Sequence, residues 1–179
     1  MLEKQLIIEI KKGDWSAFRR LYDLYFDYAI RVAAAVTNNP TIAADIVQET
    51  FIRVYTHIED FDEERDFKPW FYRILINECR RYLKKYAKVV PMEVDEQRIK
   101  ATKSNWHKFE EYADLYEALQ SLDDHHRIPL ILKYIHDLTE MEIALALNLH
   151  LNTVKSRLYK AKRKLKGILD KKGGTAHEK

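Results

Sequence analysis

The sequence has little of what a disulfide-rich, membrane-spanning or metal-binding protein needs. Its 179 residues include one cysteine, four glycines and four prolines, and one cysteine cannot form an internal disulfide. No apolar run approaches the roughly eighteen residues of a membrane span, and no signal-peptide pattern opens the chain. The seven histidines show no metal-ligand spacing. We therefore predict a soluble, cytoplasmic protein with no metal, no other cofactor and no membrane insertion of its own.

Strand patterns are also scarce, whereas apolar residues recur at helical spacing along most of the chain. This periodicity predicts an all-α fold. Asp14 is placed to cap a long helix, which the Asn-Asn-Pro sequence at residues 38–40 should end. The cysteine, Cys79, falls on the apolar side of a helix. A buried core residue is therefore favoured over a reactive thiol.

Residues 138–169 contain two helical patterns separated by a short break, the pattern of a helix-turn-helix. Thr139 and Glu142 form a capping box at the start of the first helix. After the break, an apolar stripe with one-face helical spacing predicts that the second helix packs along one side. The residues of this stripe are Val154, Leu158, Ala161 and Leu165.

The opposite side of this second helix is strongly basic. Residues 143–179 hold ten Lys or Arg and two acids, whereas residues 112–142 hold seven acids and two basic residues. Charge segregated in this way suits a surface that faces phosphates. A solvated basic helix that closes a bundle is the plain alternative. The side chains expected to contact bases or phosphates are Lys155, Ser156, Arg157, Tyr159, Lys160 and Arg163.

A second candidate surface lies on the helix predicted at residues 41–58. Asp45, Gln48, Glu49 and Ile52 share the face opposite its buried side. Two acids and an amide around one apolar residue suit docking to a basic partner, and ordinary solvent surface is the alternative.

The acidic loop at residues 59–67 has no role that the sequence identifies. A calcium loop needs glycine near its middle and an acid at its twelfth position, and neither is present. Paired carboxylates for hydrolysis would need a nucleophile, an oxyanion site or metal-binding histidines nearby. No catalytic site can be assembled, so the sequence predicts that the chain is not an enzyme.

The helix that Lys68-Pro69 opens combines an aromatic ring, an amide and basic side chains on one arc. Such a surface suits single-stranded DNA, because cations hold phosphates while a base stacks on the ring. Inward packing of the tryptophan is the open alternative. The candidate residues are Trp70, Arg73, Asn77, Arg80, Arg81 and Lys84.

Three stretches resemble bacterial RNA polymerase sigma factors of the extracytoplasmic-function (ECF) type, in the sigma-70 family. Residues 153–161, Thr-Val-Lys-Ser-Arg-Leu-Tyr-Lys-Ala, resemble the recognition helix of region 4. Residues 44–51, Ala-Asp-Ile-Val-Gln-Glu-Thr-Phe, resemble the region 2 segment that grips the clamp helices of polymerase. Residues 70–82, from Trp-Phe-Tyr-Arg to Cys-Arg-Arg-Tyr, resemble the helix that melts and recognises the minus-10 element. One departure is His150, where the family commonly has a small hydroxyl residue as helix cap.

The resemblance implies two small helical domains joined by a flexible linker. The expected parts are region 2 at residues 1–88, a linker at 89–111, region 4 with its helix-turn-helix at 112–170, and a disordered tail at 171–179. Region 2 would bind core polymerase and the minus-10 element and assist strand opening, and region 4 would read the minus-35 element. The implied partners are the clamp helices and flap of core RNA polymerase, promoter DNA and an anti-sigma factor that covers the DNA-facing surfaces.

A stand-alone helix-turn-helix regulator that binds duplex DNA without polymerase is the alternative. The linker argues against it. About two dozen residues span roughly 25 to 30 Å as a free coil and about 80 Å when fully extended. Promoter elements two DNA turns apart lie about 70 Å from each other. A partner such as polymerase would therefore have to hold the two domains apart on DNA.

Overall fold

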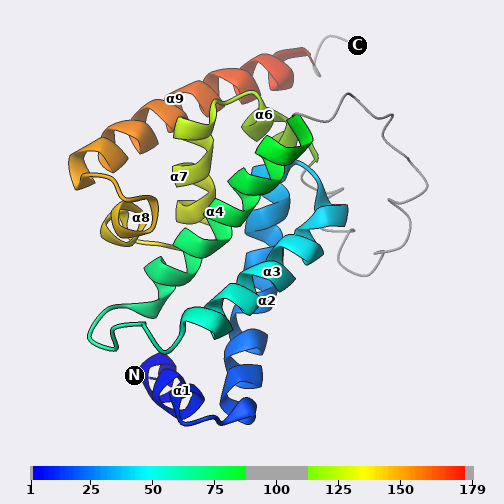
Figure 1. Cartoon of the computed structure of the whole chain (residues 1–179). Coiled ribbons are helices and arrows are strands. Elements are labelled where there is room, and N and C mark those ends of the chain that lie inside the picture. The colour runs from blue at the N-terminus through cyan, green and yellow to red at the C-terminus, as the bar shows by residue number, and fades with distance from the viewer. Residues whose placement is uncertain (1, 88–112, 176–179) are drawn as a thin grey trace. The chain divides into compact units, whose positions relative to one another are not determined.

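The computed structural model describes residues 2–87 and 113–175. Within these ranges the chain forms eight helices and no strand, which confirms the predicted all-α fold (Figure 1). The helices group into two compact units, one with α1 to α4 and the other with α6, α7, α9 and the start of α8. The predicted linker at residues 89–111 lies outside the described residues. None of the described helices is long and apolar enough to span a bilayer.

A tight turn joins α1 (Leu2–Lys11) to α2 (Trp15–Thr37). Gly13 has a φ of 88° there, a conformation that glycine adopts without the steric cost of a Cβ. Asp14 then caps α2 as predicted, because its Oδ1 accepts hydrogen bonds from the backbone N–H of Ser16 at 2.8 Å and of Ala17 at 3.4 Å.

Helix α3 (Pro40–His57) begins where the Asn-Asn-Pro sequence was predicted to end α2. Asn38 takes a left-handed conformation with a φ of 52°, which stops α2. Asn39 caps α3 by accepting a hydrogen bond from the backbone N–H of Thr41 at 3.2 Å. Proline is tolerated in the first turn, where its missing N–H would have no helical partner.

Aromatic rings fill the core where α2, α3 and α4 (Phe67–Ala87) lie side by side. The centroid of the Phe71 ring lies 4.7 Å from that of Tyr25 and 5.3 Å from that of Phe51. Such tilted pairs add to the stability that burial alone provides. Cys79 is fully buried here, and burial raises the pKa of its thiol to about 12. The prediction of a core cysteine is confirmed.

In the second unit, α6 (Ala113–Gln120) and α7 (Asp124–Ile135) both pack against α9 (Leu151–Thr175). Helix α9 continues to Thr175, so the expectation of a disordered tail from residue 171 is wrong for residues 171–175. The buried apolar side chains of this unit include Leu119, Leu122, Ile128, Ile131, Leu132, Val154, Leu158 and Ala161.

Helices α8 (Glu140–Leu147) and α9 form the predicted helix-turn-helix. The capping box is complete in both directions. Glu142 Oε2 accepts a hydrogen bond from the backbone N–H of Thr139 at 2.6 Å, and Thr139 Oγ1 accepts one from the backbone N–H of Glu142 at 3.2 Å. Asn148, with a φ of 53°, ends α8 and turns the chain toward α9.

Asp123 caps α7 and also joins it to α9. Its carboxylate accepts from the backbone N–H of His126 at 3.2 Å, lies 2.7 Å from Nδ1 of the same histidine and 3.3 Å from Nζ of Lys164. The hydrogen bond with His126, followed by that with Lys164, lowers the pKa of Asp123 to about 2. The ionised form is therefore favoured in the folded state.

Replacing Asp123 by alanine should lower the free energy of unfolding by about 1 kcal/mol, the usual cost of losing an N-cap. Asp123→Asn keeps a capping oxygen and loses only the charge. Because the pKa is lowered on folding, the charge-dependent stabilisation is complete above the ordinary value of 3.8 and is lost as pH falls toward about 2. Urea titrations should show the gap between native chain and Asp123→Asn closing over that window. A gap independent of pH would contradict this account.

Candidate functional site

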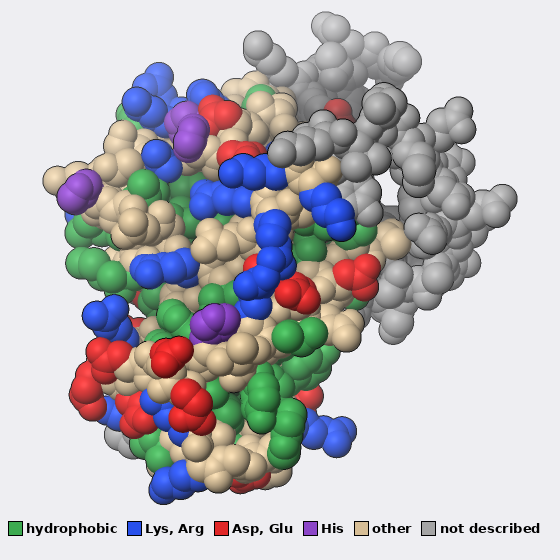
Figure 2. Space-filling view, viewed as in Figure 1, with side chains coloured by type: hydrophobic (Ala, Val, Ile, Leu, Met, Phe, Trp, Pro, Cys, Tyr) green, Lys and Arg blue, Asp and Glu red, His purple; other side chains and the backbone are tan. Residues whose placement is uncertain are grey.

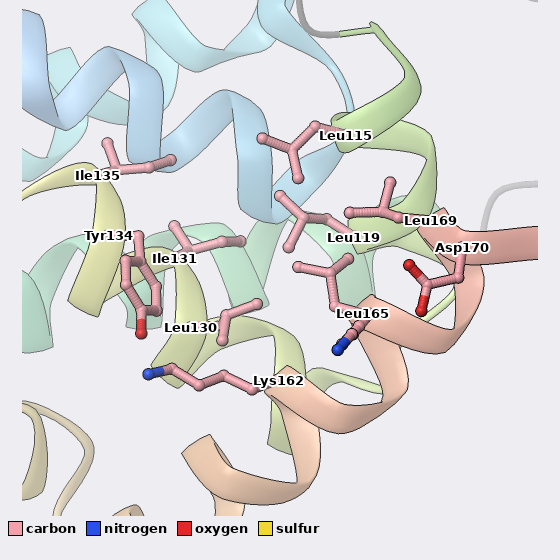
Figure 3. A pocket seen from close by; sticks show the side chains of 11 residues that line it. Leu115, Leu119, Leu130, Ile131, Tyr134, Ile135, Lys162, Leu165, Leu169 and Asp170 are labelled. Atoms are coloured by element: carbon pink, nitrogen blue, oxygen red, sulfur yellow. The ribbon is translucent and has the colours of Figure 1, made fainter. Parts of the chain in front are cut away.

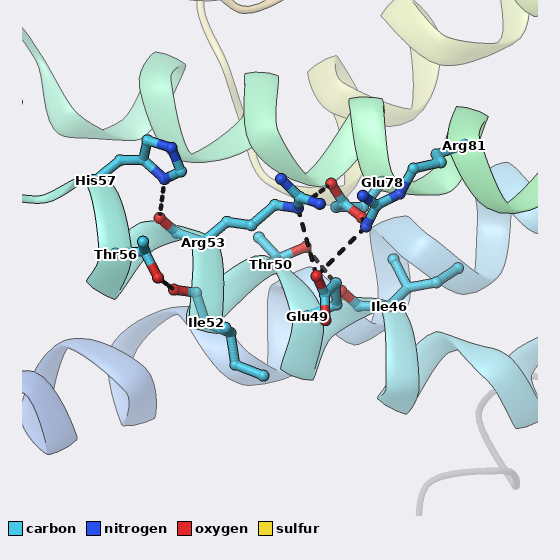
Figure 4. Close-up of polar contacts among 9 residues, drawn as sticks. All are labelled: Ile46, Glu49, Thr50, Ile52, Arg53, Thr56, His57, Glu78 and Arg81. Atoms are coloured by element: carbon cyan, nitrogen blue, oxygen red, sulfur yellow. Dashed lines mark hydrogen bonds and ion pairs between the residues drawn. The ribbon is translucent and has the colours of Figure 1, made fainter.

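The four residues of the predicted docking face lie on the outer side of α3. Asp45, Gln48 and Ile52 are exposed, with Ile52 at 52%, and Glu49 is half-buried. The opposite side of the helix is buried against the core, as its periodicity predicted. Side chains of α3 are fixed in part by i−4 hydrogen bonds of Thr50 and Thr56 to backbone carbonyls, drawn in Figure 4.

The same side of the first unit carries an aromatic pair that sequence analysis did not single out. Trp15 of α2 is 64% exposed and Tyr55 of α3 is 42% exposed. Their rings stack, with centroids 4.8 Å apart and an interplanar angle of 21°. Tyr55 lies one turn after Ile52 on α3, so the apolar part of the face extends beyond one isoleucine.

Glu49 is engaged with two arginines rather than free in solvent. Its Oε1 lies 3.5 Å from Nε of Arg53 and 3.4 Å from Nη2 of Arg81, which belongs to α4 (Figure 4). From the sequence, Glu49 is predicted to contact polymerase and Arg81 to contact DNA. The structure brings these two residues together.

Helix α4 presents the predicted basic arc. Arg73, Asn77, Arg81 and Lys84 are exposed, and Arg80 is half-buried. Figure 2 shows Lys and Arg side chains along this helix, while acidic side chains gather at the loop between α3 and α4. A row of cations with an amide among them can hold a phosphate backbone.

Trp70 lies at the start of the same arc but is only half-exposed. Its ring centroid lies 4.8 Å from that of Phe61 and 5.6 Å from that of Phe67, both of which are buried. One side of the indole therefore packs on the core, and the remainder is open to solvent. Inward packing is therefore confirmed in part, and contact of Trp70 with DNA stays a prediction.

The acidic loop is tied to α1 by two lysines. Lys4 Nζ lies 2.7 Å from Glu64 Oε1, and Lys11 Nζ lies 3.1 Å from Glu63 Oε1. Lys11 also donates a hydrogen bond to the backbone carbonyl of Phe61 at 2.7 Å. No cluster of three His, Cys, Asp or Glu side chains in the described ranges could hold a metal ion, and this loop is no exception.

On α9 the predicted DNA-reading face points away from the packed side. Val154, Leu158 and Ala161 are buried and Leu165 is half-buried, whereas the opposite face is open. Tyr159 is 63% exposed, and the guanidinium of Arg163 lies 5.8 Å from the centre of its ring. The exposed candidates are Lys155, Ser156, Tyr159, Lys160 and Arg163, and Arg157 is half-buried.

His150 precedes α9 at the position where a capping side chain was expected. Its backbone carbonyl accepts hydrogen bonds from the N–H of Thr153 at 3.0 Å and of Val154 at 3.1 Å. The helix therefore starts at Leu151, and Asn152 lies exposed within its first turn.

An apolar groove of about 630 Å³ lies among α6, α7 and α9 (Figure 3). Leucine and isoleucine side chains from all three helices form its walls, and Lys162, Lys166 and Asp170 of α9 line it as well. Nζ of Lys162 lies 5.2 Å from the centre of the Tyr134 ring. The groove could not be predicted from the sequence, because it depends on how three separate helices pack.

Glu78 is a charged residue whose burial was not predicted from the sequence, as is Arg127 in the second unit. The Glu78 side chain is 8% exposed, and its Oε1 lies 2.6 Å from Nε of Arg53. The signal was present, because Glu78 follows Phe71 by seven positions and Leu75 by three on the apolar stripe of its helix. A carboxylate at such a position must be paired when buried.

Comparison with known protein families gives two matches along the chain. Residues 21–89 match the model of sigma-70 region 2, and this range includes most of α2 and all of α3 and α4. Residues 112–165 match the model of sigma-70 region 4, which covers the helix-turn-helix. The two matches therefore include all three candidate surfaces.

Comparison with individual proteins and solved structures agrees with these matches. The chain is 30% identical to the ECF RNA polymerase sigma factor SigW of Bacillus subtilis, over 93% of this chain and 96% of SigW. Its fold is similar to that of CnrH, solved in complex with the cytosolic domain of CnrY, with a TM-score of 0.78, 24% identity and coverage of 95% and 98%. It is also similar to the sigma factor RpoE of Bartonella quintana, solved with the anti-sigma factor NepR, with a TM-score of 0.67, 20% identity and coverage of 86% and 96%. The chain thus belongs to the ECF sigma factors of the sigma-70 family and directs promoter-specific transcription with RNA polymerase.

Proposed function

We propose that the two units of the chain divide the work of promoter recognition. The first, residues 1–88, binds core polymerase and the minus-10 element and assists strand opening. The second, residues 112–170, reads the minus-35 element, and residues 89–111 link them. The observation that carries the proposed role of the first unit is the position of two separate exposed faces, acidic and apolar on α3 and basic on α4, within one small bundle.

The face of α3 binds the clamp helices of polymerase in this proposal. Ile52 supplies an apolar anchor, and Asp45, Gln48 and Glu49 surround it with groups that pair with basic and amide side chains. An apolar centre with a polar rim is the usual composition of a protein interface. The exposed stack of Trp15 on Tyr55 lengthens the apolar part of the face.

The arc of α4 holds the melted minus-10 strand. Arg73, Arg80, Arg81 and Lys84 contact phosphates, Asn77 contacts a base edge, and the open side of Trp70 gives a surface for stacking. The chain catalyses no reaction of its own. It assists strand opening because binding to unpaired bases favours the open state over the duplex.

Helix α9 enters the major groove of the minus-35 element. Tyr159 and Arg163 stand on its most exposed side, and arginine can donate two hydrogen bonds to guanine O6 and N7. Lys155, Arg157 and Lys160 contact phosphates on either side, and Ser156 reaches a base or phosphate.

Two further features complete the proposed function. The apolar groove among α6, α7 and α9 accepts an apolar segment of the polymerase flap. An anti-sigma factor, the kind of partner with which the RpoE structure was solved, covers the DNA-facing surfaces until transcription is required. Since polymerase and promoter DNA are cytoplasmic in bacteria, the proposed function implies that the chain works in the cytoplasm.

Two experiments test the proposal. The first is co-sedimentation of the purified chain with core RNA polymerase of its own host, and the second is transcription from a library of genomic fragments. We expect tight binding and new start sites that share two spaced motifs. Direct and specific binding of the chain alone to duplex DNA, without affinity for core polymerase, would instead favour a stand-alone helix-turn-helix regulator.

A further inference from the structure

Four charged side chains connect the outer face of α3 to the basic arc of α4. Glu49 and Arg53 come from α3, and Glu78 and Arg81 come from α4 (Figure 4). Each carboxylate pairs with both arginines. Glu78 lies 2.6 Å from Arg53 and also binds Arg81, while Glu49 lies 3.5 Å from Arg53 and 3.4 Å from Arg81. We refer to these four residues as the α3–α4 ion-pair cluster.

The members of the cluster differ in how far solvent or a partner can reach them. The side chain of Glu78 is 8% exposed, whereas those of Glu49 and Arg81 are 44% and 53% exposed. A partner can therefore capture Glu49 from one side and Arg81 from the other. Glu78 stays beneath them and keeps both arginines in place, because a buried carboxylate is costly to leave unpaired.

The cluster has no net charge in the free protein, since two carboxylates meet two guanidinium groups. Arg81 is consequently held between two acids, and a phosphate that approaches it meets their repulsion. A cation that pairs with Glu49 removes one of the two acidic contacts of Arg81. Arg81 then keeps Glu78 as its anchor and can turn its exposed side to a phosphate.

We propose that Glu49 restrains Arg81 in the free chain, and that a basic polymerase residue which pairs with Glu49 releases Arg81 for contact with DNA. This inference rests on the proposed assignment of Glu49 to polymerase and of Arg81 to DNA. It adds that the two contacts are energetically linked within one unit, with Glu78 as the positioning residue. Because linkage is reciprocal, DNA held by Arg81 also strengthens the contact of Glu49 with polymerase.

Glu49→Gln tests the restraint without polymerase. It keeps the size of the side chain and removes its charge, so Arg81 should be partly released. Fluorescence anisotropy of the full chain with a labelled oligothymidylate should show affinity rising about two- to fivefold, the range expected for one exposed ion pair. The distinguishing result is that Glu49→Gln strengthens DNA binding and weakens polymerase binding.

Asp45→Asn is the matched control for net charge. Asp45 lies one turn earlier on the same exposed face of α3, so its neutralisation changes the net charge of the protein by the same amount. The gain from Glu49→Gln should exceed the gain from Asp45→Asn. Glu49→Ala serves as a second variant, and circular dichroism verifies that each protein is folded.

A double-mutant cycle with Arg81→Gln separates the failure of this inference from the failure of the underlying assignment. We expect Arg81→Gln to weaken binding and to reduce the gain from Glu49→Gln to that of Asp45→Asn. If Arg81→Gln leaves affinity unchanged, the assignment of Arg81 to DNA is wrong and the inference falls with it. If Arg81→Gln weakens binding without reducing the gain from Glu49→Gln, the restraint is wrong and the assignment stands. The same conclusion follows if the gain from Glu49→Gln never exceeds the gain from Asp45→Asn.

Discussion

Core RNA polymerase should bind the Ile52→Asp variant at least about 30-fold more weakly than the native chain, a loss of about 2 kcal/mol that is typical of an interface anchor. Ile52 is 52% exposed on α3 and lies among Asp45, Gln48 and Glu49. An aspartate at this position would place an unpaired charge in the apolar centre of the docking face. Equilibrium titration of labelled chain with core polymerase measures the loss.

Leu24→Asp is the control for this substitution. Leu24 is 43% exposed and lies within α2, so the change introduces the same charge into a helix of the same unit. It stands apart from the positions of α2 whose rings contact Phe51 and Tyr55 of α3. We expect both variants to melt at similar temperatures and only Ile52→Asp to lose polymerase binding. Equal losses for the two variants would remove Ile52 from the interface.

From the sequence alone, a charge reversal at Glu49 would test polymerase docking as well as a substitution at Ile52 does. The structure shows why Ile52 is the better position. Sequence periodicity placed the Glu49 side chain on the exposed arc, where Glu49→Lys would affect docking alone. The carboxylate instead pairs with Arg53 and Arg81, so a lysine there would meet two cations. The loss of polymerase binding in that variant would be mixed with damage to the α3–α4 ion-pair cluster.

Local signals explain why most of the helices could be predicted. The cap at Asp14, the Asn-Asn-Pro break and the capping box of Thr139 and Glu142 each act within a few residues of the chain. Each one satisfies backbone N–H groups that a helix start leaves free. Their geometry is therefore nearly independent of the rest of the fold, and the sequence alone contains the information.

Contacts between distant parts of the chain could not be predicted in the same way. Arg81 pairs with Glu49 across 32 positions, and Lys11 reaches Phe61 across 50. Helical periodicity gives the face on which a residue lies but not the residue that stands opposite. The apolar groove was missed for the same reason, since α6, α7 and α9 each contribute only part of it.

Arg163→Ala should weaken binding of the minus-35 element by about 1 to 3 kcal/mol, or roughly 5- to 150-fold, if the guanidinium contacts a base. Arg163 lies on the exposed side of α9, beside the ring of Tyr159, opposite the buried stripe of Val154, Leu158 and Ala161. The loss should be largest on the native promoter and small on promoters altered at the base pair that Arg163 reads. Binding of holoenzyme to a panel of such promoters measures this dependence.

Lys164→Ala is the matched control, because Lys164 is the next residue on α9 and carries the same charge. Its Nζ lies 3.3 Å from Asp123, so its side chain turns toward α7 rather than toward the reading face. Removing it should change DNA affinity little and independently of promoter sequence. If Arg163→Ala also weakens every promoter equally, and reduces the salt dependence of binding by about one ion, then Arg163 contacts a phosphate and the base is read by another residue of α9.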